Sequence, residues 1–108
     1  MSIINISKAN LKKLKYNNLE DWLKDPNHIY IGRDMSFYVK GAKASKWCNP
    51  YSAKKYGREE CLKLYRDYII KNEELKKQLP ELMGKTLGCW CKPEACHGDI
   101  LVDIMKNN

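Results

Sequence analysis

The sequence lacks a continuous apolar run of about 18 residues, so we expect no membrane-spanning helix. The first residues, Met1 to Ile6, include no long apolar segment and do not look like a secretory signal. Cysteines spaced Cys-x2-Cys, the usual arrangement of a zinc knuckle, are also missing. These absences predict an intracellular protein that is neither secreted nor bound to a membrane.

The five cysteines are an odd number, and without signs of secretion they are predicted to be free thiols or ligands rather than a disulfide framework. A chain of 108 residues has room for one modest core. Its apolar fraction of 44% favours a globular fold over disorder. We therefore predict a single domain that spans residues 1–108.

Basic residues outnumber acidic ones, which gives the chain a formal net charge of +7. Such a charge favours polyanionic partners: nucleic acid, nucleotide phosphates or an acidic protein. The lysines are scattered, however, so solubility explains the charge equally simply. The same two interpretations apply to residues 1–17. This segment is either a basic N-terminal arm that contacts phosphates or a solvated face. The lysines of this segment are Lys8, Lys12, Lys13 and Lys15.

Hydrophobic periodicity and capping residues divide the chain into strands and helices. The predicted strands are 2–6, 28–31 and 86–91, and the predicted helices are 19–24, 58–71, 73–83 with a break at Pro80, and 99–106. A long irregular connection covers 34–57, and such connections are usually functional or mobile. Strands separated by helices predict a small α/β domain. We expect a short parallel sheet of about three strands flanked by helices, a Rossmann-like three-layer arrangement with right-handed crossovers.

Three cysteines and one histidine gather where the last predicted strand meets the last helix, in the spacing Cys89-x-Cys91-x4-Cys96-His97. The positive end of a helix, with an adjacent imidazole, would lower the pKa of a thiol there. Cys96 or Cys91 is therefore a candidate nucleophile, with His97 as its general acid or base. Two alternatives stay open. These groups only bind the phosphate or carboxylate of a ligand, or they are buried structural cysteines with His97 capping the turn.

The same four residues, Cys89, Cys91, Cys96 and His97, are of the types that bind zinc. Geometry argues against a simple tetrahedral site. Cys89 and Cys91 lie about 6.6 Å apart on an extended strand, and the neighbouring side chains of Cys96 and His97 diverge by roughly 100° if both are helical. Zinc is therefore an alternative interpretation of the cluster, and no cofactor is expected in the main one.

A second polar segment follows a predicted strand at Gly32-Arg33. The glycine permits a sharp turn or a close approach to a ligand, and the arginine presents a planar fork to phosphate or carboxylate, with a surface ion pair as the alternative. Because parallel strands end at one edge of the sheet, we predict that this segment and the Cys/His cluster line one pocket. Further predicted ligand-binding residues are Trp47, Asn49, Trp90, Gly98 and Asp99.

Aromatic residues are interleaved with basic ones in the irregular connection. They offer either stacking faces for a nucleobase or anchors that hold the loop to the core. The aromatic residues concerned are Phe37, Tyr38, Trp47, Tyr51 and Tyr56. Asp99 has a simpler alternative as well, because an acidic residue in the first turn of a helix is favourable by itself.

Several blocks of the sequence resemble one family. They are Tyr30-Ile31-Gly32-Arg33, Trp47-x-Asn49-Pro50-Tyr51, Tyr65-Arg66-x-Tyr68 and a final block with Cys89-Trp90-Cys91-Lys92-Pro93-x-x-Cys96-His97-Gly98-Asp99. Over residues 28–105 the chain resembles the family catalogued as domain of unknown function 4326, common in phages, giant viruses and bacteria. The resemblance implies a viral or phage origin and a location in the host cytoplasm or nucleus, or in the virion. It implies no reaction.

Two positions depart from related patterns. Cys48 stands where the family pattern suggests glycine, so the turn before Asn49 is expected to differ. The Cys-His pair after a strand also resembles other α/β proteins with a Cys-His-Arg signature. Gly98 occupies the place of that arginine, so the anion-binding role of the signature transfers only in part.

Two functions fit these observations. In the first, the protein binds a nucleotide-like or other phosphate-bearing ligand at the Cys/His site, and whether it also processes that ligand is left open. In the second, it is a basic nucleic-acid-binding protein with a structural zinc at the Cys/His cluster, acting in viral transcription or replication. The second function predicts an affinity for DNA or RNA that falls steeply with salt.

Overall fold

The sheet contains three parallel strands, and the last strand in the sequence lies in the middle. The computed structural model describes residues 2–91 and 96–106. In it, β3 (Thr86–Cys89) pairs with β1 (Ser2–Asn5) on one side and with β2 (His28–Tyr30) on the other. All three strands therefore end at the same edge, and the predicted small α/β fold is confirmed.

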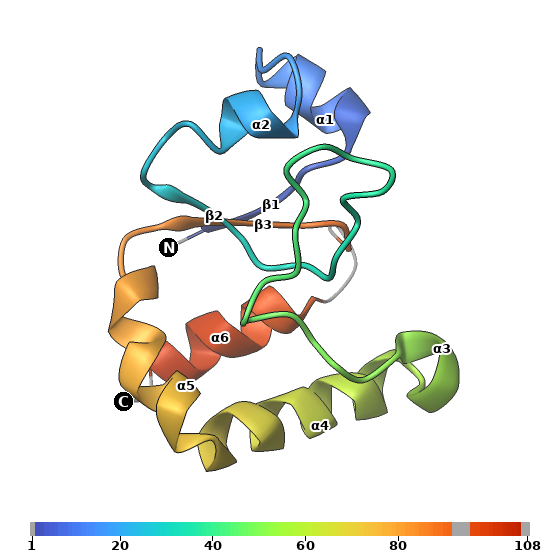
Figure 1. The fold of residues 1–108 in the computed structure, drawn as a ribbon. Helices are drawn as coiled ribbons and strands as arrows, with labels where there is room; N and C mark the ends of the chain where they lie inside the picture. The colour runs from blue at the N-terminus through green and yellow to red at the C-terminus, as the bar shows by residue number, and fades with distance from the viewer. Residues whose placement is uncertain (1, 92–95, 107–108) are drawn as a thin grey trace.

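Helices cover both faces of this sheet, as Figure 1 shows. On one face lie α1 (Lys8–Lys13), α2 (Leu19–Trp22) and the loop that follows β2. On the other face lie α6 (His97–Lys106), α4 (Arg58–Lys71) and α5 (Glu73–Gln78), with the 3-10 helix η1 (Leu79–Leu82) after α5. A short helix, α3 (Ala53–Tyr56), precedes α4. Among the described residues, no helix is long and apolar enough to cross a bilayer.

Most elements begin and end at the residues that predicted them. The side chain of Asn18 caps α2 by accepting a hydrogen bond from the Asp21 N–H at 2.8 Å, and Asn72 caps α5 through the Leu75 N–H at 3.1 Å. α4 covers the predicted range, and the expected break at Pro80 takes the form of η1. Two short helices are absent from the predicted elements: α1 lies in the basic segment 1–17, and α3 lies inside the predicted irregular connection.

A buried cluster lies on each face of the sheet. Leu87 and Cys89 point toward α4 and α6, whereas Gly88 faces α2. A Cβ atom on Gly88 would lie 2.7 Å from the ring of Trp22 and 2.8 Å from Ile6, so a glycine lets α2 pack directly on the central strand. The second cluster comprises Ile6, Leu11, Leu19, Trp22, Tyr30 and Ala42.

Candidate functional site

The sulfur atoms of Cys89, Cys91 and Cys96 gather at the carboxyl end of β3, beside the start of α6. Cys96 Sγ lies 2.8 Å from Cys89 Sγ, and the side chain of Cys91 is hydrogen-bonded to both. Cys89 and Cys96 are each only 1% exposed, whereas Cys91 is half-buried. The cluster therefore has a buried pair of thiols and reaches the surface at Cys91.

Cys96 and Asp99 cap the first turn of α6. The Gly98 N–H donates to Cys96 Sγ at 3.3 Å, and the Cys96 N–H donates to the carboxylate of Asp99 at 3.0 Å. This reciprocal pair has the form of a capping box, with an acidic residue at the third helical position. It explains why α6 begins at His97, two residues before the predicted start. It also gives Asp99 the helix-stabilising role that was its simpler alternative.

Gly98 brings the first turn of α6 close to the sheet. A Cβ atom there would lie 2.8 Å from Cδ1 of Ile3 and 2.9 Å from Cδ1 of Ile31. Ile3 belongs to β1, and Ile31 follows β2. The glycine therefore lets the start of α6 pack closely against the carboxyl edge of the sheet, which also places Cys96 there.

His97 is buried beside Cys96, with 8% of its surface exposed. Its Nε2 atom lies 2.6 Å from the carbonyl oxygen of Ile31, and its Nδ1 atom lies 3.8 Å from Cys96 Sγ. A carbonyl can only accept, which assigns the ring proton to Nε2. Burial lowers the pKa of His97, so the ring is neutral at pH 7 and turns the lone pair of Nδ1 toward the Cys96 thiol.

The three sulfurs differ in protonation. Hydrogen bonds from Cys89 and Cys96, followed by one from Arg58, hold the pKa of Cys91 well below its ordinary value. The same sulfur contacts, together with burial, raise the pKa of Cys96. These opposite shifts make Cys91 the sulfur that most readily becomes a thiolate, whereas they favour the thiol form of Cys96. A thiolate is the nucleophilic form of cysteine.

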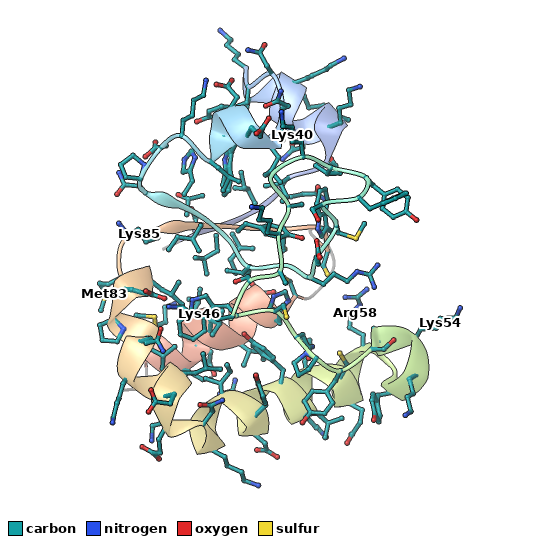
Figure 2. The ribbon with its side chains drawn as sticks, in the orientation of Figure 1. Lys40, Lys46, Lys54, Arg58, Met83 and Lys85 are labelled. Carbon is teal, nitrogen blue, oxygen red and sulfur yellow. The ribbon has the colours of Figure 1, made fainter. Side chains whose placement is uncertain are left out.

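Arg58 contacts the cluster through Cys91 and is a residue of the candidate site that the sequence analysis did not name. It is exposed at the first position of α4, and Figure 2 shows it pointing from there toward the carboxyl edge of the sheet. A cation at the positive end of a helix is unfavourable for the helix itself. This is the signal that could have singled it out, because a residue that opposes the helix dipole needs a partner elsewhere.

The segment after β2 meets the cluster through its backbone. The bond from His97 to the Ile31 carbonyl places residue 31 against α6, and Arg33 follows two residues later as an exposed side chain. The close approach at Gly32 is to the ring of Tyr30, within 2.7 Å of a Cβ atom built there. The Tyr30 hydroxyl donates to the Arg33 carbonyl. Gly32 therefore shapes the turn that carries Arg33.

Trp90 lies on the opposite face of β3 from the sulfurs. Its indole N–H donates to the Tyr30 hydroxyl at 2.8 Å, and the two rings meet edge to face. The ring is half-buried against the α2 cluster. The alternation predicted along this strand thus places Trp90 and Tyr30 on one side of the edge, and Cys89 and Cys91 on the other.

The polar contacts of Trp47 and Asn49 are made outside the cluster of Cys89, Cys91 and Cys96. Trp47 is 1% exposed, and its indole N–H donates to Glu81 at 3.1 Å. Asn49 donates to Cys61 Sγ at 3.0 Å and accepts the Tyr51 N–H at 2.9 Å. These contacts match the alternative in which the connection is anchored to the core. We leave both residues out of the proposed site.

The sulfur cluster does not have the geometry of a zinc site in this arrangement. Two sulfurs bound to one tetrahedral zinc, each at about 2.3 Å from the metal, would lie roughly 3.7 Å apart. Cys89 Sγ and Cys96 Sγ are closer, at 2.8 Å. Within residues 2–91 and 96–106, no three or more His, Cys, Asp or Glu side chains are grouped as metal ligands. We therefore derive no step through a metal.

The fold and the cluster define a small three-layer α/β protein with three cysteines at the carboxyl edge of its sheet. The family model described as "Domain of unknown function (DUF4326)" matches residues 14–107, and the chain belongs to this family. It is 36% identical over 88 residues to "Uncharacterized protein R718" of Acanthamoeba polyphaga mimivirus, covering 72% of this chain and 66% of that protein. The chain thus spans slightly less than two thirds of this relative.

A second relative comes from a bacteriophage. The "Uncharacterized 12.4 kDa protein in nrdA-td intergenic region" of Enterobacteria phage T4 is 38% identical over 74 residues, or 65% of this chain and 68% of the phage protein. No solved structure matches the chain. Relatives of the chain thus occur in a giant virus and in a phage. Because both are uncharacterised, the chemistry has to come from the site itself.

Proposed function

We propose that the protein binds a nucleotide-like, phosphate-bearing ligand beside Cys91 and attacks it with the Cys91 thiolate. The observation that carries this proposal is a half-buried thiolate held between two buried thiols and the guanidinium of Arg58. A guanidinium is a planar fork that matches the oxygens of a phosphate. The site thus combines a nucleophile with a contact for a negatively charged ligand.

Side chains rather than the helix end supply the anion contact in this proposal. In the first turn of α6, the Cys96 N–H and the Gly98 N–H both donate within the cap. Arg58 approaches the cluster from α4, and Arg33 is exposed on the adjoining segment after β2. Arg33 thus follows the carboxyl end of β2, and Arg58 points toward the same edge of the sheet, where ligands of parallel α/β proteins usually bind.

The proposed reaction is a hydrolysis through a covalent intermediate. Cys91 Sγ uses its electron pair to bond an electrophilic carbon of the ligand, and the leaving group departs with the electrons of the broken bond and the proton of the Cys96 thiol. Water then cleaves the new carbon–sulfur bond, returns one proton to Cys96 and restores the Cys91 thiolate. His97 acts as a positioning residue, because its Nδ1 faces Cys96 while Nε2 is bound to Ile31.

Protection from alkylation tests the ligand class. Iodoacetamide should modify Cys91 before the buried Cys89 and Cys96, as located by peptide mass spectrometry. Nucleoside monophosphates should slow this modification, whereas the corresponding nucleosides should not. Arg58→Gln should abolish the protection. The matched control is Arg66→Gln, which removes the same charge from α4 where Arg66 binds Asp103 instead.

Three results would overturn the proposal. The first is that neither inorganic phosphate nor any nucleoside monophosphate changes the alkylation rate of Cys91. The second is that the double variant Cys96→Ala/His97→Ala leaves both Cys91 reactivity and ligand protection unchanged. The third is one zinc per chain by elemental analysis together with unreactive thiols, which would favour the structural-zinc alternative.

A viral and intracellular setting belongs to the same proposal. It is supported by the mimivirus and phage relatives and by free cysteines among the described residues, as expected of a reducing compartment.

A further inference from the structure

Two aromatic side chains of the loop after β2 stand in solvent. Phe37 is 91% exposed and Tyr38 is 78% exposed. Their rings meet edge to face, with centroids 5.1 Å apart. Aromatic rings gain much from burial, so this pair presents apolar area that the fold itself does not use.

The loop holds this pair on an ordered turn. The Met35 N–H donates to the Ala42 carbonyl at 2.7 Å, and the Val39 N–H donates to the Met35 carbonyl at 2.8 Å. Met35 and Val39 also pack against the buried cluster beneath α1 and α2. Anchors therefore flank the exposed pair on both sides, and its rings can receive a partner with little loss of backbone entropy.

The layer formed by α1, α2 and the loop after β2 is rich in exposed basic side chains. Lys40, labelled in Figure 2, is 86% exposed and lies 3.8 Å from Glu20. Within the part of the chain that the structure describes, six more cations of α1 and the neighbouring loops form no ion pair. These are Lys8, Lys12, Lys13, Lys15, Arg33 and Lys43. The layer from residue 7 to residue 44 has eight basic and four acidic residues.

We infer that Phe37 and Tyr38 form a stacking platform for single-stranded nucleic acid, whose phosphates would contact the exposed lysines of the same layer. Unpaired bases offer π faces to aromatic side chains, and a basic surface follows the backbone. A duplex hides those faces, and an acidic peptide would use the charges without the rings. Neither ring belongs to the proposed Cys91 site, although Arg33 is common to both, and the platform does not depend on the ligand of Cys91.

Fluorescence anisotropy with a labelled oligo-deoxythymidylate tests the inference. The wild-type chain should bind it with an affinity that falls as salt rises. Phe37→Ala/Tyr38→Ala should weaken binding at least about fivefold, the equivalent of losing one stacked base. Met83→Ala is the matched control and should bind as the wild type does. Met83 is 67% exposed beside η1, away from the loop, and is labelled in Figure 2.

The double variant Lys12→Gln/Lys13→Gln tests the contribution of the lysines. It should reduce the slope of log affinity against log salt concentration by about 0.7 for each phosphate that the variant no longer neutralises. An unchanged melting temperature of both double variants shows that the fold is intact. Absence of binding at low salt would overturn the inference. So would unchanged affinity of the Phe37→Ala/Tyr38→Ala variant, equally tight binding of a duplex, or binding to anionic lipid vesicles in place of the oligonucleotide.

Discussion

The Nε2 atom of His97 lies 2.6 Å from the carbonyl oxygen of Ile31, which joins the first residue of α6 to the residue after β2. The two residues are 66 positions apart in the chain. The bond sets both the orientation of the imidazole and the nitrogen that carries its proton. It therefore links the protonation state of His97 to the packing of α6 against the segment after β2.

Acid should destabilise the protein through this histidine. The pKa of His97 is lowered in the folded chain because the ring is buried, whereas an unfolded histidine takes up a proton below about pH 6.5. Below that pH the unfolded state binds more protons, so the free energy of unfolding falls, by at most about 1.4 kcal/mol per pH unit. Urea unfolding at about pH 7.5 and about pH 5.5 measures the loss.

His97→Gln provides the comparison for this prediction. The glutamine amide has an N–H that can donate to the Ile31 carbonyl, and it does not titrate. The variant should lose less stability than the wild type over the same pH interval. An equal loss in both chains would place the acid sensitivity elsewhere.

Cys91 should react at low pH, where ordinary thiols do not. Because its pKa is held well below the usual value by Cys89, Cys96 and Arg58, its alkylation rate should change little between about pH 8 and about pH 6. N-acetylcysteine should slow about tenfold per pH unit over the lower part of that range. Arg58→Gln should make the rate at Cys91 more pH-dependent, and Arg66→Gln should not. A Cys91 rate that parallels N-acetylcysteine would contradict the assigned thiolate.

Gly88→Ala should destabilise the fold by about 1–3 kcal/mol, the usual cost of overpacking. The new methyl group would lie 2.7 Å from the ring of Trp22, which is buried and rigid. Gly98→Ala should cost less. Its nearest neighbours are the terminal methyl groups of Ile3 and Ile31, which can turn away, and alanine improves the helix. Thermal unfolding of the two variants measures which one loses more stability. A larger loss of stability in Gly98→Ala than in Gly88→Ala would contradict the packing described.

Asp99→Ala should cost about 0.5–2 kcal/mol, because it removes the carboxylate that caps the Cys96 N–H. Asp103→Ala, on the same helix, removes an exposed ion pair with Arg66 and should cost about 0.2–1 kcal/mol. Nucleoside monophosphates should still protect Cys91 from alkylation in the Asp99→Ala variant. Loss of that protection with unchanged stability would make Asp99 a ligand contact instead of a cap.

Local signals predicted most of the fold. Asn18 and Asn72 cap helices because their short side chains reach free N–H groups, and that preference depends on few neighbours. The alternation around Gly88 predicted which residues of β3 face α6, since a strand has only two faces. The start of α6 was placed two residues late, because a cysteine is not a common cap and only the contact with Asp99 reveals it.

The site was predicted less completely than the fold. Cys91, Cys96 and His97 were named as candidates because they are close in the sequence and of reactive types. Arg58 was missed because its approach depends on how α4 lies below the sheet, which no local pattern encodes. Trp47 was predicted either to stack on a nucleobase or to anchor the loop, because the sequence does not distinguish an anchor from an exposed ring. Its indole is buried and donates to Glu81.

The central position of β3 has a consequence for the order in which the protein can be made. β1 and β2 do not pair with each other, so neither has a neighbour in the sheet until residues 86–89 have left the ribosome. Until then, a nascent chain contains two strands without a hydrogen-bonded neighbour, and exposed strand edges are prone to aggregate. A prematurely terminated product that stops before Thr86 has no sheet, and proteolysis should remove it rather than leave a partly active fragment.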